Sequence, residues 1–181
     1  MTALTTSSPV AVTMGEPAGI GGEITLKAWR SRAELPPFFA VDDPERLRNL
    51  AQHLAIDVPV VEIEAPEEAQ SCFQFALPVL PLVLESGVVP GSPDGTNEIA
   101  VIESIDRALD LVTSGAASAM VTNPIHKAAL GEVGFSHLGH TGYLGEKAEI
   151  DRPVMLLCSP RLKAVPVTVH QPLAEAIASL S

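Results

Sequence analysis

The chain has 181 residues, of which 46% are apolar and 18% are charged, and its 11 Lys and Arg against 22 Asp and Glu give a net charge of −11. This length makes one domain or slightly more at roughly 150 residues per domain, and the apolar content argues against global disorder. The acidic balance, without a basic run, argues against a nucleic-acid partner. A few local donors can still hold one small phosphate group.

The sequence shows no sign of export or membrane insertion. Residues 1–8 are polar, lack a basic region and an apolar run, and are expected to form a disordered N-terminus. The longest apolar stretch, 75–84, is too short to cross a bilayer and is interrupted by proline. Cys72 and Cys158 are not in a CxxC pair, so we expect buried thiols in a reducing compartment. These features predict a cytoplasmic protein without a membrane partner.

Short β-type runs alternate with helical patterns in the first part of the chain. The expected elements are, in chain order, a buried strand (9–13), a glycine-rich turn (15–22), a helix (23–30), a strand (38–41), a helix (44–54) and a strand (58–63). The Asp42-Asp43 pair before Pro44 is a start signal for the second helix. The proline-rich stretch 65–93 allows no assignment.

The alternation continues to the last residue. A helix over 97–112 is predicted by apolar side chains at helical spacing, namely Ile99, Ile102, Ile105, Leu109 and Val112, and Gly115 is its stop signal. The remaining expected elements are a strand (119–122), a short helix (127–130), a helix (143–150), two strands (154–158 and 163–169) and the start of a helix (173–180). This order predicts an α/β fold with a largely parallel sheet. Ligands of such sheets bind in loops at the carboxyl ends of strands, which here follow Thr13, Thr122 and Val169.

The loop after Thr13 is glycine-rich and runs Met14-Gly-Glu-Pro-Ala-Gly-Ile-Gly-Gly-Glu23. A strand, a glycine turn and a helix start can aim backbone N–H groups at an anion or let a cofactor approach closely. Gly19 and Gly21 are therefore candidate contacts with a substrate or cofactor. The loop matches neither the G-x-G-x-x-G fingerprint nor a Walker A loop. A tight turn without a ligand is the alternative.

The loop after the strand 119–122 is Thr-Asn-Pro-Ile-His-Lys (122–127). Pro124 stiffens it, and Thr122 and Lys127 are candidate contacts with a substrate phosphate or carboxylate. The alternative for Lys127 is a solvated lysine at the start of a helix.

A third polar cluster is His-Leu-Gly-His-Thr-Gly (137–142). Two histidines three residues apart suggest a metal pair, but Gly139 and Gly142 indicate a turn rather than one helix face. A substrate contact from His140, with the Thr141 hydroxyl as a second handle, fits this turn better.

His170 follows the last apolar strand and precedes a proline turn. Imidazole is a common ligand of zinc and similar ions, but a site needs further ligands. Taken alone, a histidine such as His170 is more often a hydrogen-bonded residue near the core edge than a metal ligand. His53 and His126 are expected to be surface residues.

In this order, these segments resemble the 4-hydroxythreonine-4-phosphate dehydrogenase family of pyridoxal phosphate biosynthesis. The resemblance extends from Pro9 nearly to the last residue. The motifs that carry it are Gly-Glu-Pro-Ala-Gly-Ile-Gly-Gly-Glu (15–23), Gly-Ser-Pro-Asp-Gly-Thr-Asn (91–97), Val-Thr-Asn-Pro-Ile-His-Lys (121–127), Gly-His-Thr (139–141) and Val-Thr-Val-His-Gln-Pro-Leu (167–173).

The resemblance implies a three-layer α/β/α fold like that of the isocitrate and isopropylmalate dehydrogenases. It implies NAD-dependent oxidation and decarboxylation of 4-phosphooxy-L-threonine to 3-amino-2-oxopropyl phosphate, with NAD or NADP and a divalent metal (Zn, Mg or Co). The family acts as a homodimer with its active site at the interface. Carried over, His140 and Thr141 would contact the substrate and His170 would bind the metal, whereas no catalytic residue is assigned.

Several positions depart from the family pattern. Glu16 stands where an aspartate is usual, Gly22 where a proline is usual, and Gly142 where a glutamate usually follows Gly-His-Thr, and Asn123 and His126 also differ. These departures are compatible with ordinary drift. They are also compatible with a related dehydrogenase of a phosphorylated sugar acid, threonate or erythronate 4-phosphate.

Family members are considerably longer than this chain. The resemblance therefore covers an N-terminal portion (9–181), with a subdomain boundary near 115–130 and the C-terminal half absent, so that the fold is incomplete relative to the family. From this we expect the isolated chain to bind metal and cofactor poorly and to turn over little substrate. A non-catalytic half-chain or binding module is the alternative to a dehydrogenase.

Overall fold

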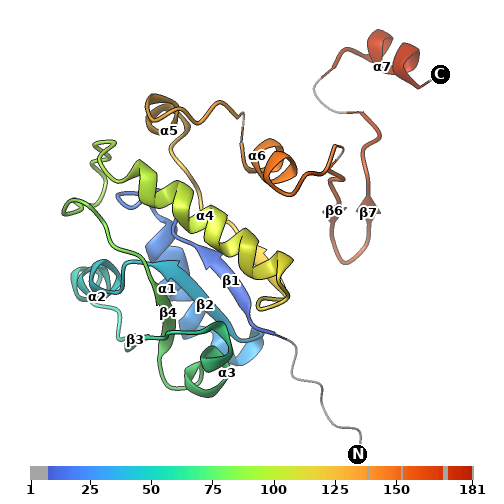
Figure 1. Ribbon diagram of the computed structural model, residues 1–181. Helices are drawn as coiled ribbons and strands as arrows, with labels where there is room; N and C mark the ends of the chain where they lie inside the picture. Colours follow the sequence, from blue (N-terminus) through green and yellow to red (C-terminus); the bar gives the residue numbers. More distant parts are fainter. Residues whose placement is uncertain (1–7, 138, 152, 169–170, 181) are drawn as a thin grey trace, which may run out of the picture.

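The computed structural model describes residues 8–137, 139–151, 153–168 and 171–180 (Figure 1). Its centre is a five-stranded parallel sheet in the order β3-β4-β2-β1-β5. The strands are β1 (Val10–Thr13), β2 (Phe38–Asp42), β3 (Val60–Glu62), β4 (Leu77–Pro81) and β5 (Ala119–Val121). The expected disordered segment lies, except for Ser8, outside the described residues.

Helices cover both faces of this sheet. On one face lie α1 (Gly21–Arg30) and α2 (Pro44–His53), and on the other α3 (Ala69–Cys72) and α4 (Glu98–Thr113), with short 3-10 turns at Arg32–Glu34 and Pro66–Glu68. Side chains of a strand alternate between faces, so Phe38 packs with α1 and α2 while Phe39 packs with α3 and α4. The predicted three-layer α/β/α architecture is confirmed.

The strand β4 lies in the stretch that allowed no assignment. It contains two prolines, which normally exclude a central strand, yet it lies between β3 and β2. Its ladder with β3 spans Leu77 to Val79 and its ladder with β2 spans Val79 to Pro81. The Leu77 N–H points to β3, where it bonds Pro59 O at 2.8 Å. Because amides alternate in direction, Pro78 faces β2 before that ladder begins and Pro81 faces β3 after that ladder ends, so neither proline removes a ladder bond.

Two further helices pack on α4. They are α5 (Lys127–Glu132) and α6 (His140–Lys147), and α6 begins three residues before the predicted helix 143–150. A cluster of apolar and aromatic side chains joins these helices to α4, namely Val101, Ile105, Leu130, Phe135 and Tyr143.

The last part of the chain does not join the parallel sheet. β6 (Leu157–Cys158) and β7 (Lys163–Ala164) form a separate antiparallel pair, followed by α7 (Leu173–Ser179), and Figure 1 shows this segment extending away from the sheet. The expectation of two more strands in a largely parallel sheet is therefore wrong.

Both cysteines are free, and Cys158 is exposed rather than buried. No helix among the described residues is long and apolar enough to cross a membrane.

Candidate functional site

The glycine-rich loop after β1 closes tightly on the loop after β5. Gly15 has φ +68°, and a Cβ there would lie 2.6 Å from Pro124 O. A Cβ on Gly21, which is buried, would lie 2.6 Å from Met14 O and 3.0 Å from the Asn123 Cβ. Only glycine fits these positions, because the two loops pack backbone against backbone.

Three N–H groups of this loop are taken up by the chain itself. Glu16 N donates to Pro124 O at 2.8 Å, and Gly19 N donates to Glu16 O at 3.0 Å. Ala18 N donates to the Glu16 carboxylate at 3.0 Å. The Glu16 carboxylate thus already serves as the anion for the Ala18 amide, which favours the tight-turn alternative for this amide. Contacts of Gly19 and Gly21 with a ligand stay predictions.

Asn123 ties the two loops to α1. It is buried, and its Nδ2 donates to Thr13 O at 2.8 Å and to Thr25 Oγ1 at 2.9 Å. Its backbone N–H donates to Thr13 Oγ1 at 3.1 Å. These bonds use both amide protons of Asn123, so its role here is structural. Thr122, which precedes it at the end of β5, is half-buried and stays a predicted contact.

Lys127 and His140 come together at the start of two helices. Lys127 is the first residue of α5, and its Nζ lies 4.0 Å from where a Cβ on Gly139 would be. His140 is the first residue of α6, and burial, together with the Lys127 charge, lowers its pKa. The neighbouring Thr141 is exposed. The structure thus brings three of the predicted site residues into one corner.

The imidazole of His140 has an unsatisfied atom. Its Nε2 is buried and has no hydrogen-bond partner among the residues that the structure describes. Buried polar atoms without partners are uncommon in folded proteins and often belong to a functional group. Because the lowered pKa keeps the ring neutral near pH 7, Nε2 can accept a proton or donate one, depending on the tautomer.

The helix that carries His140 is anchored to α4. The Tyr143 hydroxyl donates to Asp106 Oδ1, and Lys147 Nζ donates to Asp106 Oδ2 at 2.8 Å. Burial, then the hydrogen bond to Asp106, raises the pKa of Tyr143 to about 12, so the hydroxyl keeps its proton as the donor. This contact orients the start of α6 and hence His140.

His137 belongs to the same packing cluster rather than to a metal pair. Its ring meets Phe135 and Tyr143 edge to face, with centroids 5.5 and 5.3 Å apart. Within the described ranges, no three His, Cys, Asp or Glu side chains are placed to hold a metal ion. His170, the predicted metal ligand, lies outside the described residues, and its role stays a prediction.

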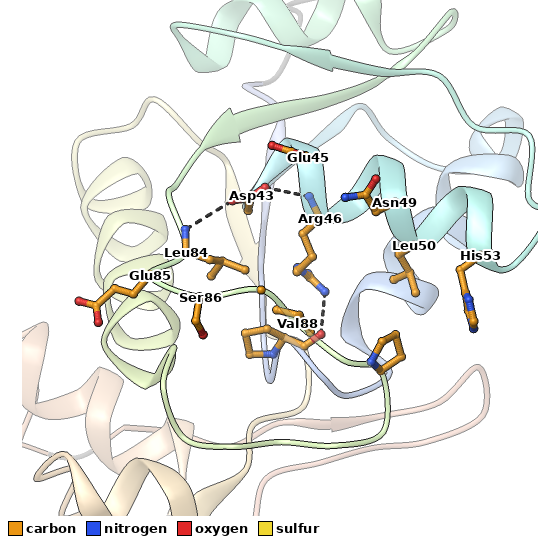
Figure 2. A pocket seen from close by; sticks show the side chains of 13 residues that line it. Asp43, Glu45, Arg46, Asn49, Leu50, His53, Leu84, Glu85, Ser86 and Val88 are labelled. Atoms are coloured by element: carbon orange, nitrogen blue, oxygen red, sulfur yellow. Dashed lines mark hydrogen bonds between the residues drawn. The ribbon is translucent and has the colours of Figure 1, made fainter.

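A separate pocket of about 520 Å³ opens where β2 and β4 end (Figure 2). The helices that follow these neighbouring strands, α2 and α4, lie on opposite faces of the sheet, an arrangement that commonly creates a ligand crevice. Arg46 lies in its wall, but its guanidinium is already bound by Asp42, at 3.0 Å from Nε, and by Pro17 O, at 2.9 Å. The other polar lining residues are Asp43, Glu45, Asn49, His53, Glu85 and Ser86.

The sequence analysis missed this pocket for an identifiable reason. Half of its wall comes from residues 84–90, in the stretch that allowed no assignment. The recognisable signal was Asp43, which caps α2 by accepting from Arg46 N at 2.8 Å and also accepts from Leu84 N at 3.4 Å. A cap residue at the end of a parallel strand marks this edge of the sheet.

Comparison with known proteins identifies the family to which the chain is similar. The family model described as pyridoxal phosphate biosynthetic protein PdxA matches residues 34–181. A 4-hydroxythreonine-4-phosphate dehydrogenase from Methylorubrum populi is 52% identical over 171 residues, which is 90% of this chain and 49% of that protein.

Solved structures agree with this result. A 4-hydroxythreonine-4-phosphate dehydrogenase from Burkholderia phymatum superposes with a TM-score of 0.86 at 28% identity, covering 94% of this chain and 52% of that one. The corresponding enzyme from Klebsiella pneumoniae has a TM-score of 0.81 at 29% identity, covering 96% and 55%. The chain thus spans about half the length of the relatives that it matches. Over that span, it belongs to the pyridoxal phosphate biosynthetic protein PdxA family.

Proposed function

We propose that this chain carries the substrate-contacting part of a 4-hydroxythreonine-4-phosphate dehydrogenase. The reaction is the NAD-dependent oxidation of the secondary alcohol of 4-phosphooxy-L-threonine, followed by decarboxylation to 3-amino-2-oxopropyl phosphate, within pyridoxal phosphate biosynthesis. The observation that carries the proposal is the buried Nε2 of His140, which lacks a hydrogen-bond partner among the described residues and lies beside the Lys127 ammonium, in a chain of this family.

Each residue of this corner has a role that fits its chemistry. The Lys127 ammonium is a mobile point charge suited to a phosphate or carboxylate. The His140 imidazole, neutral near pH 7, hydrogen-bonds a substrate hydroxyl or phosphate oxygen through Nε2, and this bond satisfies the buried atom. Thr141 adds a hydroxyl from the adjacent exposed position. Thr122, Gly19 and Gly21 remain further candidate contacts at the neighbouring strand ends.

The proposal includes NAD or NADP as hydride acceptor and a divalent metal, with Zn, Mg and Co as candidates. A metal of this kind polarises the alcohol oxygen when it is bound. The described residues do not by themselves form a metal site, because no cluster of three His, Cys, Asp or Glu side chains is present among them. His170 is proposed as one metal ligand.

Phosphorus NMR of 4-phosphooxy-L-threonine titrated with this chain tests the substrate site. We expect Lys127→Met and His140→Phe each to weaken binding by roughly tenfold or more, about 1.4 kcal/mol. The matched controls are Lys27→Met and His53→Phe, which remove the same groups away from the corner and should leave the affinity unchanged. Equal affinities of the chain and its Lys127 and His140 variants would contradict the assignment.

The alternatives are separated by two additions to the same experiment. Threonate 4-phosphate and erythronate 4-phosphate, which lack the amino group, would bind more tightly than the amino-acid substrate if the chain belongs to a sugar-acid dehydrogenase. Formation of NADH by the chain, followed by its absorbance with NAD and Mg²⁺ or Zn²⁺ present, would exclude a non-catalytic binding module, although the chain is expected to turn over little substrate.

We also propose a homodimer with the active site near its interface. Many large apolar side chains of the segment after α6 are exposed, which is unusual for a monomer. They are Val154, Leu156, Leu157, Leu162, Val165, Val167, Leu173, Ile177 and Leu180. Light scattering on the eluting chain should give the mass of a dimer, and a monomer at micromolar concentration would contradict this part of the proposal.

A further inference from the structure

Two glutamates from distant parts of the chain meet in a small hollow. Glu16 belongs to the glycine-rich loop, and Glu98 is the first residue of α4. Both line a cavity of about 10 Å³, together with Asp94 and Asn97. Glu98 is only 2% exposed. This volume holds about one water molecule at most.

Both carboxyl groups have an oxygen without a donor. Glu16 Oε2 and Glu98 Oε2 are buried, and neither has a hydrogen-bond partner in the part of the chain that the structure describes. Ionised carboxylates only accept hydrogen bonds, so two of them cannot satisfy each other. One proton converts either group into a donor and allows a carboxyl–carboxylate hydrogen bond. The two carboxylates are therefore one proton short of forming a hydrogen bond with each other.

We propose that Glu16 and Glu98 share this proton, and that the resulting carboxyl pair is a pH-sensitive latch between the glycine-rich loop and the loop 86–97 that precedes α4. The latch joins the segment after β1 to the segment after β4. It lies outside the His140 and Lys127 corner and does not depend on the substrate assigned to the chain.

The charged groups around Glu98 all act in the same direction. Burial first, then the charge of Glu16 and the hydrogen bond to it, then the charges of Glu132 and Asp94, raise the pKa of Glu98 to about 7. Glu132 reaches in from α5, since its Oε2 lies 3.8 Å from where a Cβ on Gly95 would be. No cation is among the groups that shift the pKa of Glu98. One shared proton is therefore the simplest way to reduce the negative charge of the pair.

The contact that the latch supports is otherwise slight. Gly91 N donates to Ala18 O at 2.7 Å, which ties the loop 86–97 directly to the glycine-rich loop. The remaining bonds of the loop are internal, as in Asn97 Nδ2 to Ser86 O at 3.3 Å and Thr96 Oγ1 to Asp94 at 2.7 Å. Loss of the shared proton places two negative charges in the hollow. Because these charges repel each other, the hydrogen bond from Gly91 N to Ala18 O should open more often.

The direction of the pH dependence follows from the raised pKa. The unfolded value of the Glu98 carboxyl is 4.5 and the folded value is about 7, so the folded state binds more protons between these values. The stabilisation is complete below about pH 4.5 and is lost as the pH rises through about 7. The latch is thus closed on the acidic side of neutrality and loosened on the alkaline side.

Carbon NMR of the glutamate carboxyl groups in the 181-residue chain tests the shared proton without any mutation. We expect one carboxyl signal to titrate near pH 7, and its absence from the spectrum of Glu98→Gln assigns it, with Glu16→Gln as a second assignment if Glu98→Gln does not fold. Titration of every glutamate below about pH 5 would overturn the proposal. A shift of the same signal at neutral pH on addition of Mg²⁺ or Ca²⁺ would also overturn it, because a cation would then balance the pair.

Hydrogen exchange at the Gly91 amide tests the latch itself. Its protection factor, corrected for the intrinsic pH dependence of exchange, should fall several-fold between about pH 6 and about pH 8. Glu103→Gln, on the exposed side of α4, should behave like the unmodified chain. Glu98→Gln keeps the neutral donor at all pH values, so its protection factor should be constant. The same fall in Glu98→Gln would overturn the latch.

Discussion

The sheet region (10–121) and the C-terminal segment (154–180) contain strands of similar composition with opposite environments. In β2 every residue is buried, and Phe39 and Val41 are fully inaccessible. In β6 both residues are exposed, and Leu157 is 58% exposed. An apolar strand is thus buried only where other elements cover it, which in a parallel sheet requires helices on both faces.

This difference shows what a local pattern can decide. The apolar runs at 38–41 and 154–158 both predict a strand, and each contains one. The first is covered by α1 and α2 on one face and by α3 and α4 on the other. Within the described part of the chain, the second pairs only with β7. The number of covering elements, rather than the composition of the strand, separates the two regions.

The largest expected effect comes from breaking the buried ion pair between Arg46 and Asp42 in the sheet region. The Arg46 and Asp42 side chains are 6% and 1% exposed. Arg46→Met leaves a buried carboxylate without its partner and should lower the free energy of unfolding by about 3–5 kcal/mol. Arg48→Met removes the same group from the exposed pair with Glu62 and should cost less than about 1 kcal/mol. Urea denaturation measures both, and similar losses would contradict the burial difference.

The two regions can be compared directly with one pair of leucines. Leu26 in α1 is fully buried, whereas Leu157 in β6 is 58% exposed. Leu26→Ala should lower the free energy of unfolding by about 2–5 kcal/mol through lost burial and a cavity. Leu157→Ala should change it by no more than about 0.5 kcal/mol in the monomer. A large loss at Leu157 that grows with protein concentration would show instead that a partner chain covers this segment.

Two glycines extend the comparison to a tightly packed loop, which contains Gly15, and a helix with free space beside it, which contains Gly131. Gly15 has φ +68° and no room for a Cβ, so Gly15→Ala should destabilise the chain by about 1–3 kcal/mol. Gly131 lies in α5 with nothing within 4 Å of a Cβ, so Gly131→Ala should stabilise it by about 0.5–1 kcal/mol. Thermal unfolding of both variants should therefore shift in opposite directions. A stabilising Gly15→Ala would refute the tight packing against Pro124.

The smallest expected effect concerns the joint between α4 and α6. Tyr143→Phe removes the hydrogen bond to Asp106 and should cost about 1–2 kcal/mol in the free energy of unfolding. Lys147→Met removes the exposed contact with the same carboxylate and should cost less than about 1 kcal/mol. If the joint orients His140, Tyr143→Phe also weakens binding of the phosphorylated substrate, whereas Lys147→Met does not.

The helices and most strands could be predicted because their signals are local. The Asp42-Asp43-Pro44 start signal is realised by the Asp43 cap, and Gly115 follows α4 in the left-handed region with φ +82°. β4 could not be predicted, because its prolines fit only where the ladders with β3 and β2 cover different residues of the strand. The extent of each ladder depends on where β2 and β3 end, and the residues around 77–81 do not contain that information.

The candidate site was predictable in part for the same reason. Lys127, His140 and Thr141 were visible as polar residues after a strand and in a glycine turn, and the family resemblance implied substrate contacts for His140 and Thr141. The pairing of Glu16 with Glu98 was not visible, because the two positions lie 82 residues apart in the sequence. The orphaned Nε2 of His140 likewise depends on what packs around α6.

The sequence by itself determined the α/β class, the family and the identity of the polar residues at the strand ends, because periodicity, cap signals and ordered motifs are properties of neighbouring residues. Only the tertiary structure decided which strands are covered, how the Glu16 carboxylate binds an amide of the glycine-rich loop, and which acids share a hollow. These outcomes depend on contacts between segments far apart in the chain, where burial changes the energy of a side chain that looks ordinary in the sequence.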